Sequence, residues 1–330
     1  MNTIPVFSSI LSPEHIAGFV KEKYGLDGSV TARILKTGIS HTYLIISGAD
    51  QFIFRIYTLN WRTEKEIAEE IRLLNLLKEN NIPVSYPLAD ASSNYIQSLN
   101  APEGTRYAVL FSFAKGKKLL NIPADLHYTL GQIMAKIHAV TNNLPIERVS
   151  YTPEVLLVDS FEKLKNFLPV DTEEMLYMQS LQTYLHETFS NAETERLRKG
   201  VVHLDIWFDN FVISNNKDVT LFDFDFCGNG LLMLDIAYYV LQLYSTEKDV
   251  QELNLKKQKF FDGYESITTI SKEEKALIPA AGAAIYFFYL GVQCSRYNDW
   301  SNTFLNEIYL KRFINLLIKK WVDAYELQLK

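Results

Sequence analysis

The hydrophobic period of the chain changes part-way along, and this change constrains the fold more than any other feature. Strand-like alternation predominates first, after a short helix expected over 13–24, and helical periodicity predominates from about residue 122. The expected strands are residues 31–36, 42–47, 51–57, 94–99 and 106–113, with one helix inserted at 64–78. The pattern therefore predicts an α+β protein, in which a small antiparallel sheet with one inserted helix precedes a larger, mainly helical part.

The length of 330 residues is more than one hydrophobic core usually serves, so we expect two lobes. The N-terminal lobe is predicted to span residues 1–111 and the C-terminal lobe residues 112–330, with a hinge at 112–116. Hydrophobic residues make up 48% of the chain and charged residues 22%, which is enough apolar material for a sizeable core.

Charge and cysteine content narrow the class of protein. The net charge of −6 gives no positive field to hold a nucleic-acid backbone, so we expect no nucleic-acid partner. Two cysteines, Cys227 and Cys294, cannot form a disulfide framework and fit a reducing compartment. The first residues lack the basic region and long apolar core of a secretory signal, so the expected location is cytoplasmic.

One uncharged segment, residues 277–294, is about as long as the shortest membrane span, roughly 18 residues. It contains Pro279, Gly282 and Gly291, and small residues at helical spacing suit close packing between buried helices. We therefore expect a core helix here and no membrane partner.

Polar side chains converge at the open end of a predicted hairpin. Two mostly apolar runs, 211–214 and 219–222, flank a four-residue turn. In that register Asn210 faces Asp223, and cross-strand Cβ atoms lie about 4.5 to 5.5 Å apart. An amide oxygen and a carboxylate together suit Mg2+, which takes few protein ligands and leaves the rest to water and phosphate.

Two further aspartates flank this pair. Asp205 lies in the loop that leads into the hairpin, where a carboxylate can accept or orient a proton beside a metal ion. Asp225 shares a face with Asp223 and either assists the metal or is solvated. Asn and Asp are also common turn residues, but polar residues at converging spacings among apolar neighbours favour a site.

These motifs resemble the aminoglycoside phosphotransferase and choline kinase-like family, small-molecule kinases with the bilobal protein-kinase fold. The matching residues are His203-Leu204-Asp205 followed by Asn210, then Phe222-Asp223-Phe224, then Asp235-Ile236-Ala237. The resemblance implies that Asp205 is the catalytic carboxylate for an acceptor hydroxyl and that Asn210 and Asp223 bind Mg2+. It also implies that Asp235 steadies the catalytic loop. We expect structural roles for His138 and His203.

An ion pair is expected in the first lobe. Strand alternation makes Arg55 project from mid-strand, and Glu70 falls inside the apolar stripe of the inserted helix. A carboxylate in such a stripe requires a buried cationic partner, for which Arg55 is the natural candidate. The pair resembles the Lys–Glu pair that positions nucleotide phosphates in kinases, with Arg in place of Lys.

Two backbone segments complete the expected nucleotide site. The loop with Gly38, Ser40 and His41 is either the reduced phosphate-covering loop of this family or an ordinary hairpin turn. The segment 111–116 resembles the family hinge, where the carbonyl of Ser112 and the N–H of Ala114 would pair with the adenine edge. The cofactor-binding set is thus Arg55, Glu70, Gly38, Ser40, His41, Ser112 and Ala114.

The sequence departs from the family pattern inside the catalytic loop. Leu204 replaces the usual Gly, and Trp207-Phe208-Asp209 replaces the common His-Pro-Gly. The aromatic pair is expected to pack under the loop or to line the acceptor pocket. Other aromatic residues, Tyr286, Tyr289 and Tyr297, either line that pocket or belong to the core.

The predicted function is an ATP- or GTP-dependent transfer of the γ-phosphoryl group to a hydroxyl of a small molecule, similar to aminoglycoside phosphotransferases. Residues 54–67, 82–88 and 222–237 also resemble the homoserine kinase branch of the superfamily, so a homoserine kinase-like or choline kinase-like enzyme is an alternative. The alternative from a different class is a catalytically silent nucleotide-binding module.

Overall fold

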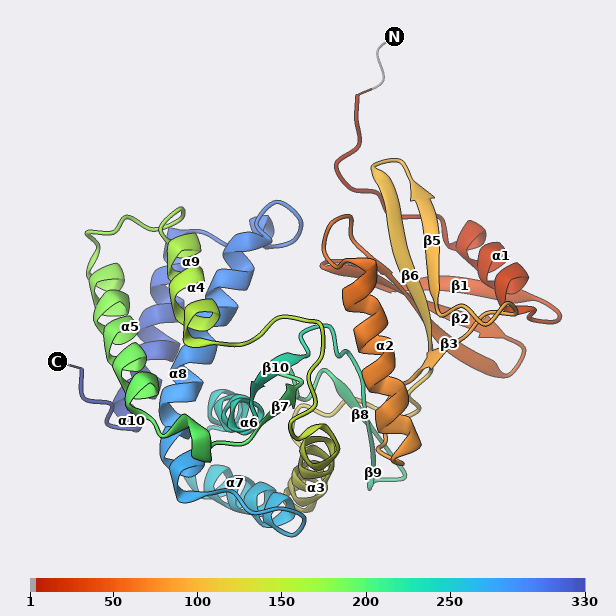
Figure 1. The fold of residues 1–330 in the computed structure, drawn as a ribbon. Coiled ribbons are helices and arrows are strands. Elements are labelled where there is room, and N and C mark those ends of the chain that lie inside the picture. The colour runs from red at the N-terminus through yellow and green to blue at the C-terminus, as the bar shows by residue number, and fades with distance from the viewer. Residues whose placement is uncertain (1–3, 330) are drawn as a thin grey trace. The chain divides into compact units, whose positions relative to one another are not determined.

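The structure is a computed structural model that describes residues 4–329. It divides into two compact units (Figure 1). The first comprises the residues through Lys115 together with Thr220–Phe222, and the second comprises Gly116–Val219 and the residues from Asp223 onward.

The first unit is built on an antiparallel sheet. Its strands are β1 (Val30–Lys36), β2 (Ser40–Ser47), β3 (Asp50–Tyr57), β4 (Pro87–Leu88), β5 (Ile96–Ala101) and β6 (Gly104–Ser112). Their order is β1-β2-β3-β6-β4, and β5 pairs with β6. The five predicted strands are confirmed. The sixth strand, β4, has only two residues, too few for a hydrophobic period to appear.

Two helices accompany this sheet. They are α1 (Pro13–Tyr24) and α2 (Glu64–Glu79). Helix α2 begins where predicted, because the Thr63 hydroxyl caps the Glu66 N–H while the Glu66 carboxylate accepts the Thr63 N–H. Its apolar stripe is buried, and so is Glu70 within that stripe.

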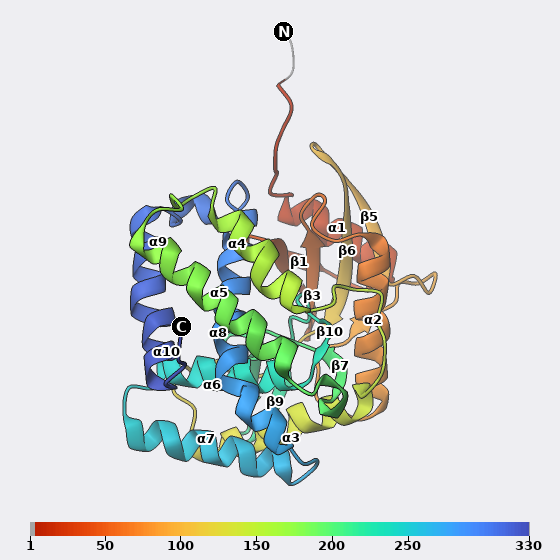
Figure 2. The same cartoon turned by 60° about the vertical axis from the view of Figure 1, so that its left-hand side comes forward.

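The second unit is mainly helical. Its α-helices are α3 (Ala124–Thr141), α4 (Asp159–Leu164), α5 (Glu173–Asn191), α6 (Met233–Thr246), α7 (Val250–Glu265), α8 (Lys272–Ser295), α9 (Glu307–Phe313) and α10 (Lys319–Ala324). The short strands β7 (Lys199–Val202) and β10 (Gly228–Leu231) pair antiparallel. Helices α3 and α7 run side by side in both views (Figures 1 and 2).

Helix α8 is the core helix that the sequence predicts. Among the described residues it is the one helix whose length and composition would allow it to cross a membrane, and 83% of its most apolar stretch is buried inside the protein. Burial of this kind is what a central packing helix requires.

The predicted hairpin is present with its second strand one residue earlier than expected. Strands β8 (Phe211–Ser214) and β9 (Asp218–Leu221) flank a turn in which Asn215 and Asn216 have φ of 50° and 59°. Asn tolerates this left-handed conformation, which explains the pair. The strand ends at Leu221, and Asp223 has φ of 66°. Asp223 therefore reaches its position through a turn, and not through extended pairing opposite Asn210.

Candidate active site

The loop after β7 is anchored by one buried carboxylate. Asp235, in the first turn of α6, accepts the N–H of His203 at 2.8 Å and the N–H of Leu204 at 2.6 Å. His138 contacts the same carboxylate at 3.1 Å and bonds the Tyr264 hydroxyl at 2.7 Å. These hydrogen bonds fit the steadying role expected of Asp235. They also fit the structural role expected of His138.

Leu204 adopts a backbone conformation that favours glycine. Its φ is 60°, so the chain makes here the turn for which the family pattern has Gly. The N–H of Leu204 donates a hydrogen bond to Asp235, and its carbonyl accepts one from the Tyr289 hydroxyl at 2.7 Å. The Leu204 side chain is buried. These contacts offset the strain of a left-handed leucine.

Asp205 stands at the centre of a hydrogen-bonded group. The Nδ2 of Asn210 donates to Asp205 Oδ2 at 2.6 Å and to the Asp205 carbonyl at 3.0 Å. The Tyr238 hydroxyl donates to Oδ1 at 2.6 Å, and the Tyr289 hydroxyl lies 3.1 Å from the same oxygen. The structure thus joins two of the three predicted acidic and amide residues directly.

The third residue, Asp223, interacts with Asp205 electrostatically. The pKa of Asp205 is raised to about 7, chiefly by burial and in part by the negative charge of Asp223. The hydrogen bonds from Tyr238, Tyr289 and Asn210 act in the opposite direction because they favour the carboxylate. Two close carboxylates create a site of negative potential that a cation would neutralise.

The donor set fits a divalent cation that arrives with other ligands. Both hydrogen bonds from Asn210 to Asp205 use Nδ2, so Oδ1 is the atom left to bind a cation. Within residues 4–329 no group of three or more His, Cys, Asp or Glu side chains could hold a metal ion alone. Mg2+ can bind where so few protein ligands are present, because it uses one or two protein oxygens and completes its coordination shell with water and phosphate.

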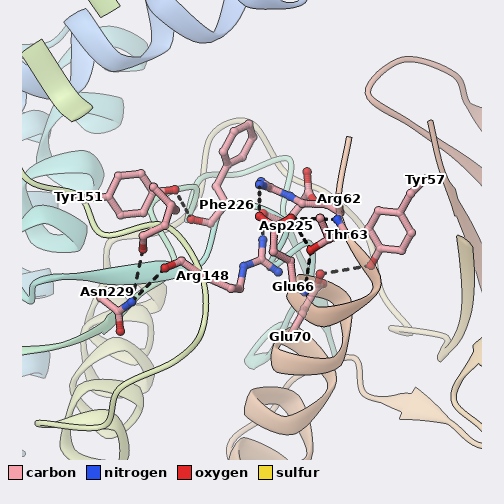
Figure 3. A network of polar contacts seen from close by, with 11 residues as sticks. Tyr57, Arg62, Thr63, Glu66, Glu70, Arg148, Tyr151, Asp225, Phe226 and Asn229 are labelled. Carbon is pink, nitrogen blue, oxygen red and sulfur yellow. Dashed lines mark hydrogen bonds and ion pairs between the residues drawn. The ribbon is translucent and has the colours of Figure 1, made fainter. Parts of the chain in front are cut away.

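The segment after Asp223 is fixed by side chains from residues 146–151 (Figure 3). Arg148 donates to the carbonyl of Asp225, and the Tyr151 hydroxyl donates to the carbonyl of Phe226. Asn229 Nδ2 donates to the Arg148 carbonyl at 3.2 Å. Asp225 itself is buried, so the alternative that it is a solvated residue is wrong.

In the first unit, Arg55 and Glu70 form the expected ion pair. Arg55 Nη1 lies 3.0 Å from Glu70 Oε1, and both side chains are buried. The Tyr57 hydroxyl donates to Glu70 Oε2 at 3.2 Å, as Figure 3 shows. The guanidinium also lies 4.8 Å from the centre of the Phe111 ring. This stacking is a contact that a lysine would not reproduce in the same way.

The turn before β2 and the first two residues of that strand, which the sequence pattern placed in a loop, carry polar atoms without hydrogen-bond partners. Gly38 has φ of 151°, a conformation that L side chains rarely adopt, and the Thr58 hydroxyl donates to the Ile39 carbonyl at 2.7 Å. In the described part of the chain, Ser40 Oγ and His41 Nδ1 are buried without a hydrogen-bond partner. Such atoms suit a strand end that meets an acceptor-rich ligand such as phosphate.

The expected hinge residues lie at and just beyond the end of β6. The carbonyl of Ser112 accepts the Ser85 hydroxyl at 2.6 Å, and the Ser112 N–H donates to the Tyr86 carbonyl at 2.8 Å. A carbonyl oxygen has two lone pairs, so Ser112 can accept one more hydrogen bond. Ala114 follows β6 and is partly exposed.

A family model for the phosphotransferase enzyme family, known as APH, matches residues 31–268. The chain belongs to this family. It is a small-molecule kinase with an α+β, protein-kinase-like fold of two lobes.

Two curated relatives of this phosphotransferase cover most of its length. An uncharacterized protein of Synechocystis sp. is 29% identical over 318 residues, which cover 94% of this chain and 86% of the relative. A homoserine kinase of Methylobacillus glycogenes is 23% identical over 258 residues, which cover 78% of this chain and 77% of the relative.

Solved structures show the same fold as this phosphotransferase. A microcompartment-associated aminopropanol kinase has a TM-score of 0.76 at 19% identity, covering 96% of this chain and 100% of the other. An amicoumacin kinase in complex with AMP-PNP, Ca2+ and Ami has a TM-score of 0.76 at 17% identity, and the match covers 95% of this chain and 94% of the other.

Of the aromatic residues considered for the phosphotransferase acceptor pocket, only Tyr289 contacts Asp205. Tyr286 is buried, shares a hydrogen bond with Ser245, and packs 5.5 Å from the Phe313 ring. Tyr297 packs on Phe167, and Trp207 packs on Phe208 at 4.6 Å. Tyr286 is therefore a core residue.

Sequence reasoning missed Tyr238 as a partner of Asp205. A usable signal existed, because Tyr238 follows Asp235 by three positions and so lies on the same face of α6. Tyr57 had a similar signal, since strand alternation places it on the face of Arg55. Tyr289 is 84 residues from Asp205, and no local pattern connects the two.

Proposed function

We propose that this kinase transfers the γ-phosphoryl group of ATP or GTP to an alcohol group of a small molecule, with Asp205 orienting the acceptor hydroxyl. The observation that carries the proposal is the group formed by Asp205 and Asn210, hydrogen-bonded at 2.6 Å, beside the charge of Asp223. This arrangement combines a proton acceptor with cation ligands at one end of a hairpin. Catalysis then consists of positioning and charge neutralisation.

Asn210 and Asp223 would hold Mg2+ in this proposal, and the ion would neutralise charge on the nucleotide phosphates. The neighbouring amicoumacin kinase structure, with its nucleotide analogue and Ca2+, supports a nucleotide donor and a divalent metal. Asp205 would accept the hydroxyl proton through the oxygen that faces the acceptor. A catalytically silent module is disfavoured, because Asp205, Asn210 and Asp223 are all retained.

The nucleotide would meet residues of the first lobe. We assign this role to the Arg55–Glu70 pair, to the loop of Gly38, Ser40 and His41, and to the backbone of Ser112 and Ala114. The unpartnered Ser40 hydroxyl supports the loop assignment. Residues 112–116 would act as the hinge between lobes 1–111 and 112–330.

A small amino alcohol is the acceptor class that the comparisons favour. Relatives over most of the chain are named homoserine kinases, and one structural neighbour is an aminopropanol kinase. Aminoglycosides and choline are the alternatives. A cytoplasmic location completes the proposal, and it fits Cys227 and Cys294, which are buried free thiols.

The test is ADP release from Mg-ATP, and GDP release from Mg-GTP, with homoserine, aminopropanol, choline, ethanolamine and spectinomycin as acceptors. Turnover should occur with one acceptor class, and Asp205→Asn should lower it by about a hundredfold or more. Binding of Mg-ADP, measured by calorimetry, should persist in Asp205→Asn and weaken in Asp223→Asn.

The matched control is Asp209→Asn in the same loop. Asp209 pairs with Lys118 at 2.6 Å on the surface, and its replacement should leave turnover close to that of the wild type. Equal activity in Asp205→Asn and the wild type would remove the assigned role of Asp205. Absence of Mg-nucleotide binding in the wild type would remove the roles of Asn210 and Asp223.

A further inference from the structure

Two phenols from different helices meet one oxygen of the catalytic carboxylate. Tyr238 extends from α6 and donates to Asp205 Oδ1 at 2.6 Å. Tyr289 extends from α8, with its hydroxyl 3.1 Å from Oδ1 and 2.7 Å from the Leu204 carbonyl. The two tyrosine rings lie 5.6 Å apart between their centres.

The two carboxylate oxygens of Asp205 differ in how many hydrogen bonds they accept. A carboxylate has about four lone-pair positions, two on each oxygen. Oδ1 faces both phenols, whereas in the described part of the chain Oδ2 accepts one hydrogen bond, from Asn210. One position on Oδ2 is therefore left for a substrate hydroxyl.

The surroundings strengthen the phenol contacts. Phe226 and Phe288 pack against Tyr289 at 5.8 Å and 5.4 Å between ring centres, and Tyr238 is buried. Hydrogen bonds to a charged group gain strength where water is excluded. Burial and the charge of Asp205 also raise the pKa of both phenols well above the usual range, so both remain proton donors near neutral pH.

We propose that Tyr238 and Tyr289 are positioning residues that hold Asp205 through Oδ1 and thereby assign Oδ2 as the oxygen that receives the acceptor's proton. The inference rests on the proposed function and deepens it. In the transfer, the hydroxyl proton passes to Oδ2 and its electron pair forms the new O–P bond. The bridging P–O bond breaks with its electrons remaining on the nucleoside diphosphate.

The two phenols position Asp205 in different ways. Tyr238 contacts the carboxylate at the shorter distance, so it fixes the carboxylate's rotation directly. Tyr289 shares its single proton between the Leu204 carbonyl, the nearer acceptor at 2.7 Å, and Asp205 Oδ1 at 3.1 Å. Tyr289 therefore holds the left-handed turn before Asp205 and contributes less to the carboxylate itself.

The test compares Tyr238→Phe and Tyr289→Phe with Tyr286→Phe, a buried tyrosine on α8 that bonds Ser245. ADP release from Mg-ATP is measured with L-homoserine and with aminopropanol. Tyr238→Phe should lower kcat by roughly 10- to 100-fold, the expected effect of one hydrogen bond to a charged group. KM for Mg-ATP should remain unchanged, and Tyr286→Phe should retain wild-type kcat.

A double variant separates positioning from a general effect on structure. If Tyr238 acts through Asp205, adding Tyr238→Phe to Asp205→Asn should lower the residual kcat no further. A further loss, or a wild-type kcat in Tyr238→Phe alone, would overturn the inference while leaving the proposed function intact. A wild-type protein that neither binds Mg-ADP nor releases ADP would instead contradict the proposed function.

A crystal structure with Mg-ADP provides a readout that needs no acceptor. In the wild type, Asp205 Oδ1 should lie within hydrogen-bond distance of both phenols, and in Tyr238→Phe the carboxylate should rotate. A wild-type structure in which neither carboxylate oxygen lies within hydrogen-bond distance of the phenols, or in which one oxygen contacts both the phenols and Asn210, would contradict the assignment.

Discussion

Leu204 departs from the family pattern and still adopts the left-handed turn for which that pattern has Gly. A leucine at φ of 60° carries a steric cost of about 1 to 2 kcal/mol relative to the right-handed conformation. Its side chain is buried, and burial of a leucine side chain contributes more than this cost. The packing gain therefore exceeds the backbone strain.

Leu204→Gly should consequently destabilise the protein although glycine fits the turn. Loss of a buried leucine costs about 2 to 5 kcal/mol, and relief of strain returns about 1 to 2 kcal/mol, so the net loss should be about 2 kcal/mol within a range of about 0 to 4 kcal/mol. Thermal unfolding measures the change. Leu204→Met conserves side-chain volume and should change stability by less than about 1.5 kcal/mol. A raised unfolding temperature in Leu204→Gly would refute this explanation.

At the same scale, the sequence was sufficient to predict the contact of Arg55 with Glu70. It was also sufficient to select Asp205 and Asn210, which bond each other directly. Those predictions rest on local spacing, which a sequence displays. The position of Tyr289 depends on how α8 packs against the catalytic loop, which local spacing does not show.

Helices α3 and α7 pack through glycines. A Cβ added to Gly131 would lie 2.1 Å from the Phe260 carbonyl oxygen, and one added to Gly263 would lie 2.0 Å from the Tyr128 carbonyl oxygen. These distances mean that backbone meets backbone, with no flexible side chain to move aside. The helix pair therefore depends on the absence of side chains at both positions.

Gly131→Ala should destabilise the protein by about 1 to 3 kcal/mol, because the helices must separate to admit the methyl group. Gly18→Ala is the matched control. Gly18 lies on an exposed face of α1 with open space around it, so alanine there should be neutral or stabilising by up to about 1 kcal/mol. Chemical denaturation measures both variants, and equal effects would show that α3 and α7 tolerate separation.

Helices and strands were predicted correctly where a hydrophobic period or a helix-capping motif is present in the sequence. Helix α2 starts at its capping box, and helix α8 displays a long uncharged stretch. The start of β9 was displaced by one residue, because two asparagines supply a tight left-handed turn that the hydrophobic pattern does not reveal. Strand β4 pairs with β6 through long-range contacts alone.

Over the whole molecule, two buried histidines make stability depend on pH. Burial lowers the pKa of His41 in the first unit and of His127 in the second unit to about 4. An unfolded chain binds these protons near pH 6.5. Below that pH the unfolded state binds more protons at these two side chains, so they should contribute a loss of stability as pH decreases from about 6.5 to about 4. The raised pKa of Asp205 acts in the opposite direction over this range, because the folded state binds that proton more readily.

His127→Gln should flatten this dependence, since the amide does not titrate and can still bond the Tyr239 hydroxyl. The wild type should lose up to about 3 kcal/mol through His127 over this range. Unfolding temperatures from pH 7.5 to 4.5 measure the effect, with His15→Gln on exposed α1 as control. Parallel curves for His127→Gln and the wild type would contradict the assignment.

The proposed phosphotransferase site of the second lobe is centred on Asp205. Its most direct test detects the phosphorylated acceptor itself, by mass spectrometry and phosphorus NMR, after incubation of homoserine or aminopropanol with Mg-ATP. We expect the wild type and Asp209→Asn to form a phosphomonoester, and Asp205→Asn to form about a hundredfold less or lower still. The same yield of phosphomonoester from Asp205→Asn would contradict it.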